Sequence, residues 1–131
     1  MERSKIILLA DDDLEDQELL EDVMLELEPV VKVHSVLNGK QVLDYLAGCK
    51  DGDLPNLIIL DYNMPELNGP QVLQLLCATP RYKKIPKLIW STSNTGSYIK
   101  ECLEKGATEY FVKPSSMVGL RKVAQNMLEL C

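Results

Sequence analysis

This sequence of 131 residues lacks the segments that would place a protein in or across a membrane. No apolar run reaches the roughly 18 residues of a membrane-spanning helix. The first apolar run, within residues 5–9, is also too short for the core of a signal peptide. We therefore expect a soluble, cytoplasmic protein with no membrane partner.

Positive charge is also scarce. The chain has 14 lysines and arginines against 20 aspartates and glutamates, which gives a formal net charge of -6. A surface with this balance repels the phosphate backbone of nucleic acids, so we expect no DNA partner. Much of the negative charge is concentrated between Asp11 and Glu28.

Paired cysteines, repeats, linkers and low-complexity stretches are absent as well. The cysteines lie far apart and form no Cys-x-x-Cys motif; they are Cys49, Cys77, Cys102 and Cys131. Such spacing is typical of buried or terminal thiols in a reducing compartment. The length and the 46% of apolar residues suit one hydrophobic core, so we expect residues 1–131 to form a single domain.

The sequence does contain a regular alternation of short apolar runs with helical patterns. The apolar runs have the length of buried strands and lie at residues 5–10, 31–36, 57–60, 87–91 and 108–112. Between them, apolar residues recur at the three- and four-residue spacing of amphipathic helices. These helices are predicted at residues 14–28, at 39–47, from about Pro70, at 97–105, and after a cap at Ser115 or Ser116.

Five strands that alternate with five helices predict an α/β protein. Alternation of this kind gives a parallel sheet that helices cover on both faces. The chain length fits a flavodoxin-like, doubly wound, five-stranded parallel sheet with the strand order 2-1-3-4-5. In such a sheet a ligand binds beyond the carboxyl ends of the strands, where the first and third strands lie side by side.

Polar residues stand at four of the five predicted carboxyl ends. The first strand ends in Asp11 and Asp12, the third in Asp61 and the fourth in Ser91, and the fifth runs into Lys113. All of these side chains are expected at one edge of the sheet. Three adjacent carboxylates repel one another unless a cation is present, and oxygen ligands of this kind suit Mg²⁺.

The same set has the parts that phosphoryl transfer to an aspartate requires. These parts are a carboxylate nucleophile, a divalent cation, and a lysine with a hydroxyl that stabilise anionic oxygens. Taken singly, each residue has a plainer interpretation. Asp13 has the position of an N-cap, Asp11 and Asp12 could be ordinary acids of a helix N-terminus, and Lys113 could be a solvated lysine. The convergence of four strand ends favours the chemical interpretation.

At these positions the sequence resembles the response-regulator receiver family of bacterial two-component systems. The resemblance covers essentially the whole chain, in the family's order and largely with its spacings. It is carried by residues 7–12 (ILLADD), 57–65 (LIILDYNMP) with Gly69, 88–91 (LIWS), Gly106-Ala107, and 110–114 (YFVKP).

The resemblance implies a role for each residue of the acidic group. Asp61 resembles the phosphoacceptor, which attacks a phosphohistidine. Asp11 and Asp12 resemble the pair that holds Mg²⁺ together with Asp61. Asn63 matches the position whose backbone carbonyl completes the metal site.

The resemblance also assigns the residues around the phosphoryl group. Lys113 resembles the lysine that pairs with it, Ser91 the hydroxyl that bonds it, and Tyr110 the aromatic switch that follows this hydroxyl. The bond between Lys113 and Pro114 resembles one that is often cis in the family. Thr92 departs from the family's usual small residue and flanks the path of a hydrolytic water.

By the same resemblance we expect a stand-alone phosphoacceptor and not an enzyme with an external substrate. Its expected partners are a sensor histidine kinase or a phosphotransfer protein, and a downstream protein target. Its expected output surface is the fourth helix, fifth strand and fifth helix, through which the family also forms homodimers. The turn from Gly48 to Asn56 is longer than in the shortest members and resembles the regulators that serve phytochrome-like kinases.

Three alternatives remain open from the residues alone. Asp11 and Asp13 have the spacing of haloacid-dehalogenase-like phosphatases, although Glu15 stands where those enzymes carry threonine or valine. The same acids alternate like a calcium loop, although Asp16 stands where that loop needs glycine. The third alternative is a receiver-like module that binds partners without phosphorylation. His34, which a phosphorelay could use, lies in a predicted strand and is interpreted as an ordinary strand residue.

Overall fold

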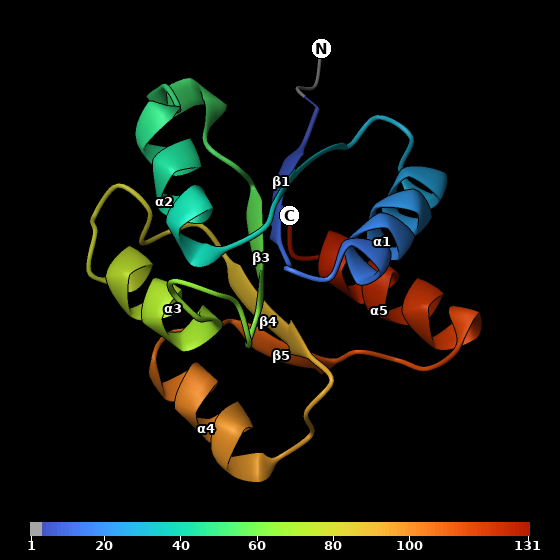
Figure 1. Ribbon diagram of the computed structural model, residues 1–131. Coiled ribbons are helices and arrows are strands. Elements are labelled where there is room, and N and C mark those ends of the chain that lie inside the picture. Colours follow the sequence, from blue (N-terminus) through green and yellow to red (C-terminus); the bar gives the residue numbers. More distant parts are fainter. Residues whose placement is uncertain (1–3) are drawn as a thin grey trace.

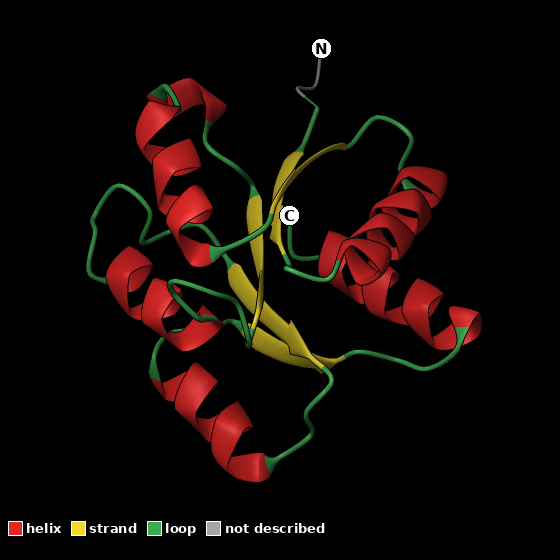
Figure 2. Cartoon of the chain, viewed as in Figure 1, coloured by secondary structure: helices red, strands yellow, loops and turns green. Residues whose placement is uncertain are grey.

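The computed structural model describes residues 4–131 as a five-stranded parallel sheet between two layers of helices (Figures 1 and 2). The strands are β1 (Ile6–Ala10), β2 (Lys32–Val36), β3 (Leu57–Asp61), β4 (Lys87–Ser91) and β5 (Glu109–Val112). The helices are α1 (Leu14–Leu27), α2 (Gly39–Gly48), α3 (Gly69–Cys77), α4 (Gly96–Glu104) and α5 (Met117–Leu128). A short 3-10 helix, Asp51–Asp53, lies in the long turn before β3.

The strand order is β2-β1-β3-β4-β5, and every pairing is parallel. The predicted fold and strand order are therefore confirmed. The three central strands are covered on both sides, which explains why their sequences are nearly continuous apolar runs. The edge strands β2 and β5 are only partly buried and carry more polar residues.

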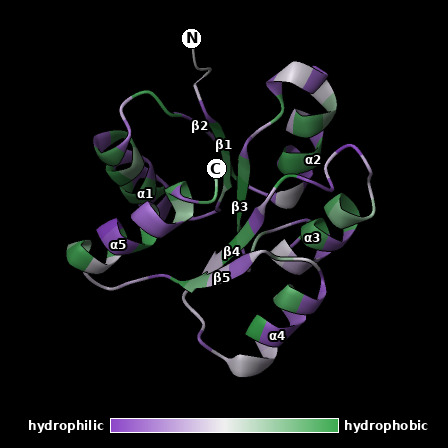
Figure 3. Cartoon of the chain, turned by 180° about the vertical axis from the view of Figure 1, so that it is seen from behind, coloured by the Kyte–Doolittle hydropathy of each residue, from purple (hydrophilic) through white to green (hydrophobic). Residues whose placement is uncertain are grey.

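Each face of the sheet has its own hydrophobic core, because successive strand residues point to opposite faces. Helices α1 and α5 cover one face, where Ile7, Leu9 and Ile59 are fully buried. Helices α2, α3 and α4 cover the other, where Leu8 and Ile58 are fully buried. Figure 3 shows the hydrophobic colour on β1 and β3 and on the inner sides of the helices. None of the helices within residues 4–131 has the length and hydropathy needed to span a membrane.

Local signals fix where the helices begin. The carboxylate of Asp13 accepts hydrogen bonds from the backbone N–H groups of Glu15 and Asp16, which confirms it as the N-cap of α1. Of the two serines proposed to cap the last helix, Ser116 is the cap of α5. The acidic residues directly follow strand β1, whereas a calcium loop of this kind follows a helix, so the calcium-loop alternative is wrong.

Candidate functional site at the carboxyl edge of the sheet

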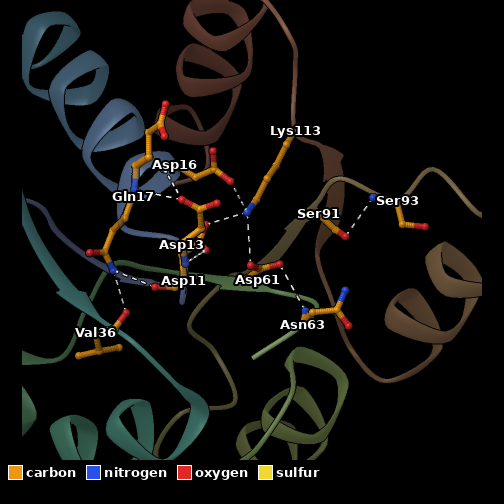
Figure 4. A network of polar contacts seen from close by, with 11 residues as sticks. Asp11, Asp13, Asp16, Gln17, Val36, Asp61, Asn63, Ser91, Ser93 and Lys113 are labelled. Atoms are coloured by element: carbon orange, nitrogen blue, oxygen red, sulfur yellow. Dashed lines mark hydrogen bonds and ion pairs between the residues drawn. The ribbon is translucent and has the colours of Figure 1, made fainter. Parts of the chain in front are cut away.

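The sheet brings the predicted strand-end residues to one edge, as Figure 4 shows. Asp11 follows β1, while Asp61 is the last residue of β3 and Ser91 the last of β4. Lys113 follows β5 directly. In the strand register Ala10 pairs with Leu60, and Asp61 pairs with Trp90. The neighbouring strands therefore end at the same height in the sheet, and the polar side chains at their ends lie next to one another.

Three carboxylates form the centre of this site. Asp11, Asp12 and Asp61 each offer a carboxylate oxygen, and these oxygens lie within 4.8 Å of one another. Asp11 is fully buried, Asp61 is 6% exposed, and Asp12 faces solvent. One end of the cluster is therefore embedded in the core and the other is open to a ligand.

The ammonium group of Lys113 balances the buried part of this charge. Its Nζ lies 2.9 Å from Oδ2 of Asp11 and 3.3 Å from Oδ2 of Asp61. It also lies 4.9 Å from the ring centroid of Trp90, a cation-π contact. The lysine side chain itself is only 9% exposed.

Burial and mutual repulsion alter the acidity of these groups. Desolvation and the nearby carboxylate of Asp11 raise the pKa of Asp61 to about 7, although the charge of Lys113 and the N–H of Asn63 oppose this rise. Desolvation works to lower the pKa of Lys113, but hydrogen bonds to carboxylates outweigh it and hold that pKa above its ordinary value. Near neutral pH the protonated form of the Asp61 carboxyl therefore competes with the ionised form. A divalent cation bound beside Lys113 would favour the ionised form.

Asp11 offers a direct test of whether a cation fits. Its Oδ1 accepts a hydrogen bond from the N–H of Asp13, whereas its buried Oδ2 has the charge contact with Lys113 and no hydrogen-bond partner within residues 4–131. The side-chain amide of Gln17 donates to the carbonyls of Asp11 and Val36 and so fixes the backbone at this point. A rigidly held carboxylate oxygen with a free lone pair, next to two further carboxylates, is suited to a hard divalent cation.

The remaining predicted residues surround this centre. Ser91 is buried, and its hydroxyl accepts a hydrogen bond from the N–H of Ser93 at 3.2 Å. Tyr110 is half-buried, and its hydroxyl donates to the carbonyl of Ser93 at 2.8 Å. The Asn63 N–H donates to Oδ1 of Asp61 at 3.3 Å. The peptide bond between Lys113 and Pro114 is trans, because none of the bonds within the described chain is cis.

One residue of the site was not predicted from the sequence. Asp16, in the first turn of α1, places its Oδ2 2.9 Å from the ammonium of Lys113. In the sequence it has the ordinary position of an acid after an N-cap, where the helix dipole favours negative charge. Asp16 lies 97 residues from Lys113 along the chain, so no local sequence pattern indicates their contact.

The fold and the site together define an α/β protein with an acidic, lysine-containing centre at the switch point of a doubly wound sheet. The sequence model of the response regulator receiver domain matches residues 7–125. The chain belongs to this family, as its sequence motifs predicted. Receiver domains act in signalling and accept a phosphoryl group from histidine kinases or phosphotransfer proteins. Membership also decides against the haloacid-dehalogenase alternative.

Among curated relatives, the response regulator ARR8 of Arabidopsis thaliana is 30% identical over 94% of this chain and 60% of its own length. ORR5 of Oryza sativa subsp. japonica is 31% identical over 93% of this chain and 87% of its own length. The chain spans only about three fifths of ARR8 and of the rice regulator ORR4.

Two solved structures show the same fold at similar identity. The phosphorylated cyanobacterial phytochrome response regulator RcpA is 25% identical, with a TM-score of 0.88 over 97% of this chain and 93% of that one. The Mn²⁺-bound response regulator Rcp1 is 26% identical, with a TM-score of 0.82 over 93% of this chain and 90% of that one.

Proposed function

We propose that residues 1–131 act as one phosphoacceptor receiver domain, in which Asp61 takes a phosphoryl group from a phosphohistidine with the help of Mg²⁺. The observation that carries this proposal is the arrangement around Asp61. Two further carboxylates, Asp11 and Asp12, lie within 4.8 Å of its carboxylate, and the ammonium of Lys113 lies 3.3 Å away. The phosphorylated relative RcpA supports the chemistry, and the Mn²⁺-bound Rcp1 supports the divalent cation.

In the proposed reaction a carboxylate oxygen of Asp61 attacks phosphorus, the phosphorus–nitrogen bond of the phosphohistidine breaks, and the imidazole leaves. Lys113 stabilises the phosphoryl oxygens through charge-assisted hydrogen bonds. Asp11, Asp12, Asp61 and the backbone carbonyl of Asn63 would hold Mg²⁺, which neutralises negative charge when bound. Hydrolysis of the aspartyl phosphate restores the carboxylate, so the domain catalyses only its own phosphorylation and dephosphorylation.

The proposed output is a shift between two conformations. Phosphorylation adds about 1.5 to 2 negative charges at Asp61, toward which the hydroxyl of Ser91 moves. In the structure, the hydroxyl of Tyr110 donates to the carbonyl of Ser93, which lies two residues after Ser91. A movement of Ser91 is therefore transmitted to the ring of Tyr110. The α4–β5–α5 face then changes, and a downstream protein or a second copy of the chain binds it.

This output face has exposed apolar side chains that suit a protein partner. They are Tyr98 and Leu103 of α4, Val112 of β5, and Met117 and Val118 of α5, with exposed fractions from 40% to 80%. We propose a histidine kinase or phosphotransfer protein as the donor and a cytoplasmic protein as the target. A DNA target is not proposed, because the net charge is -6.

The first test is the intact mass of the protein after incubation with acetyl phosphate, with and without Mg²⁺, beside an Asp61→Asn variant. We expect a gain of one phosphoryl group that requires both Mg²⁺ and Asp61. A gain that persists in the variant would assign the phosphoryl group to another residue. If neither acetyl phosphate nor a phosphorylated histidine kinase modifies the wild type, the chain is a module that binds partners without phosphorylation.

A further inference from the structure

The ammonium group of Lys113 is shared among three carboxylates, and one of them lies outside the proposed metal site. The three contacts are to Asp11 at 2.9 Å, Asp16 at 2.9 Å and Asp61 at 3.3 Å. The contacts with Asp16 and Asp61 are also hydrogen bonds, whereas the contact with Asp11 is an ion pair only. In the structure the lysine is therefore closer to Asp16 than to the proposed phosphoacceptor, and Figure 4 shows it between the two.

Asp16 differs from the other two carboxylates in its element and in its exposure. It belongs to α1, whereas Asp11 and Asp61 stand at strand ends in the acidic cluster. Its side chain is 32% exposed, against 0% for Asp11 and 8% for Asp61. Water can hydrate the carboxylate of Asp16 when the lysine leaves it, but it cannot do so for Asp11. The contact with Asp16 is thus the one that is broken at least cost.

We propose that Asp16 is a positioning residue that holds the ammonium of Lys113 toward α1 and so limits how readily the lysine reaches a phosphoryl group on Asp61. This inference rests on the proposed function. When a phosphoryl group is added at Asp61, Lys113 exchanges its contact with Asp16 for one with the phosphoryl oxygens. The carboxylate of Asp16 competes for the lysine before and during this exchange.

Asp16→Asn removes the competing charge and keeps the size of the side chain. We expect it to raise the second-order rate of phosphorylation by acetyl phosphate by about twofold to fivefold, the effect of releasing a partly exposed ion pair. The matched control is Glu15→Gln, which removes one negative charge from the neighbouring residue of α1. Glu15 is exposed and has no ion pair with Lys113 among the described residues. Removing its charge therefore reports only the effect of net charge on the electrostatic potential at the site.

A second readout follows the lysine itself without any phosphoryl donor. Trp90 is the only tryptophan of the chain, and the ammonium lies 4.9 Å from its ring centroid. If Asp16 holds the ammonium in place, Asp16→Asn shifts the emission of Trp90 in the unphosphorylated protein and Glu15→Gln does not. Urea unfolding of both variants checks that neither effect comes from a partly unfolded domain.

The outcomes separate the two proposals. A faster rate and a shifted emission in Asp16→Asn alone support the inference. An equal effect in both variants, no effect in either, or a slower rate in Asp16→Asn overturns it while the proposed function stands. If the wild type takes no phosphoryl group at all, the proposed function fails and the inference about rate fails with it.

Discussion

The carboxyl group of Asp61 couples the stability of this protein to pH. Its pKa of about 7 in the folded protein is far above the roughly 4 of an aspartate in an unfolded chain. Between these values the folded protein holds a proton that the unfolded chain has already lost. The contribution of Asp61 to the free energy of unfolding therefore decreases as the pH rises from about 4 to about 7.

Asp61→Asn removes this titration. In EDTA we expect the variant to be more stable than the wild type at pH 8, by roughly 1–3 kcal/mol, with a smaller difference at pH 5. Urea unfolding at both pH values measures the two free energies, and Asp12→Asn is the exposed control at the same site. A difference that is the same at pH 5 and pH 8 would contradict the proton bound at Asp61.

Which side chains of the site were predictable depended on how each one is positioned. Asp11, Asp61 and Ser91 were found because a strand end and a parallel sheet fix their positions from local sequence alone. Asp16 was missed because its contact with Lys113 depends on how α1 packs beside the segment after β5. That packing is decided by the apolar core that α1 and α5 share, which includes Leu20 and Leu120, and no short motif encodes it.

The start of α3 is packed against the end of β3, next to the backbone of Asp61. The N–H of Gly69 donates to the carbonyl of Tyr62 at 3.0 Å. A Cβ atom at position 69 would lie 2.6 Å from the carbonyl oxygen of Asp61 and 2.8 Å from Cδ1 of Ile89. Real Cβ atoms essentially never approach backbone this closely, so only glycine lets α3 begin here.

We expect Gly69→Ala to lower the free energy of unfolding by about 1–3 kcal/mol, because α3 must move away from β3. The matched control is Gly48→Ala at the end of α2, where a Cβ would meet no atom of the described residues within 4 Å. There alanine is expected to be neutral or stabilising by up to about 1 kcal/mol, since it favours helix more than glycine does. Urea unfolding compares the two; equal stabilities for both variants would refute the close approach at Gly69.

The boundaries of helices and strands were predictable to about one residue where a cap, glycine or proline marks them. Gly106 has a φ of 110° just after α4, the backbone that favours glycine, as its place after the predicted helix indicated. The two adjacent serines before α5 could not be distinguished, because either can cap a helix. Only the observed hydrogen bond from the N–H of Gly119 to Ser116 decides between them.

The residue after Asp61 adds a contact that the sequence did not reveal. The ring of Tyr62 stacks on Tyr98 of α4, with centroids 4.7 Å apart and an angle of 16° between the planes. The hydroxyl of Tyr62 also donates to Glu101 of α4 at 2.7 Å. The chain next to the proposed phosphoacceptor thus contacts α4 directly, in addition to the route through Ser91 and Tyr110.

The contacts of the site connect Asp61 more directly to α4 and β5 than to β2 at the opposite edge of the sheet. Asp61 contacts α4 through Tyr62, and Ser91 and Lys113 belong to the ends of β4 and β5. Strand β2 lies at the far edge of the sheet, separated from β3 by β1. We therefore expect a structural change at Asp61 to reach α4, β5 and α5 and to leave β2 and α2 largely unchanged.

Amide shifts measured by NMR before and after phosphorylation with acetyl phosphate and Mg²⁺ test this expectation. Beyond the residues next to Asp61, the largest shifts are expected in α4, β5 and the first turn of α5, with the smallest in β2. Tyr110→Ala, which removes the ring that contacts Ser93, is expected to reduce the shifts in β5 and α5. In this variant the shifts in α4 should persist in part, because the stack of Tyr62 on Tyr98 is unchanged. A phosphorylated wild-type protein with no shifts on the α4–β5–α5 face would rule it out as the output surface.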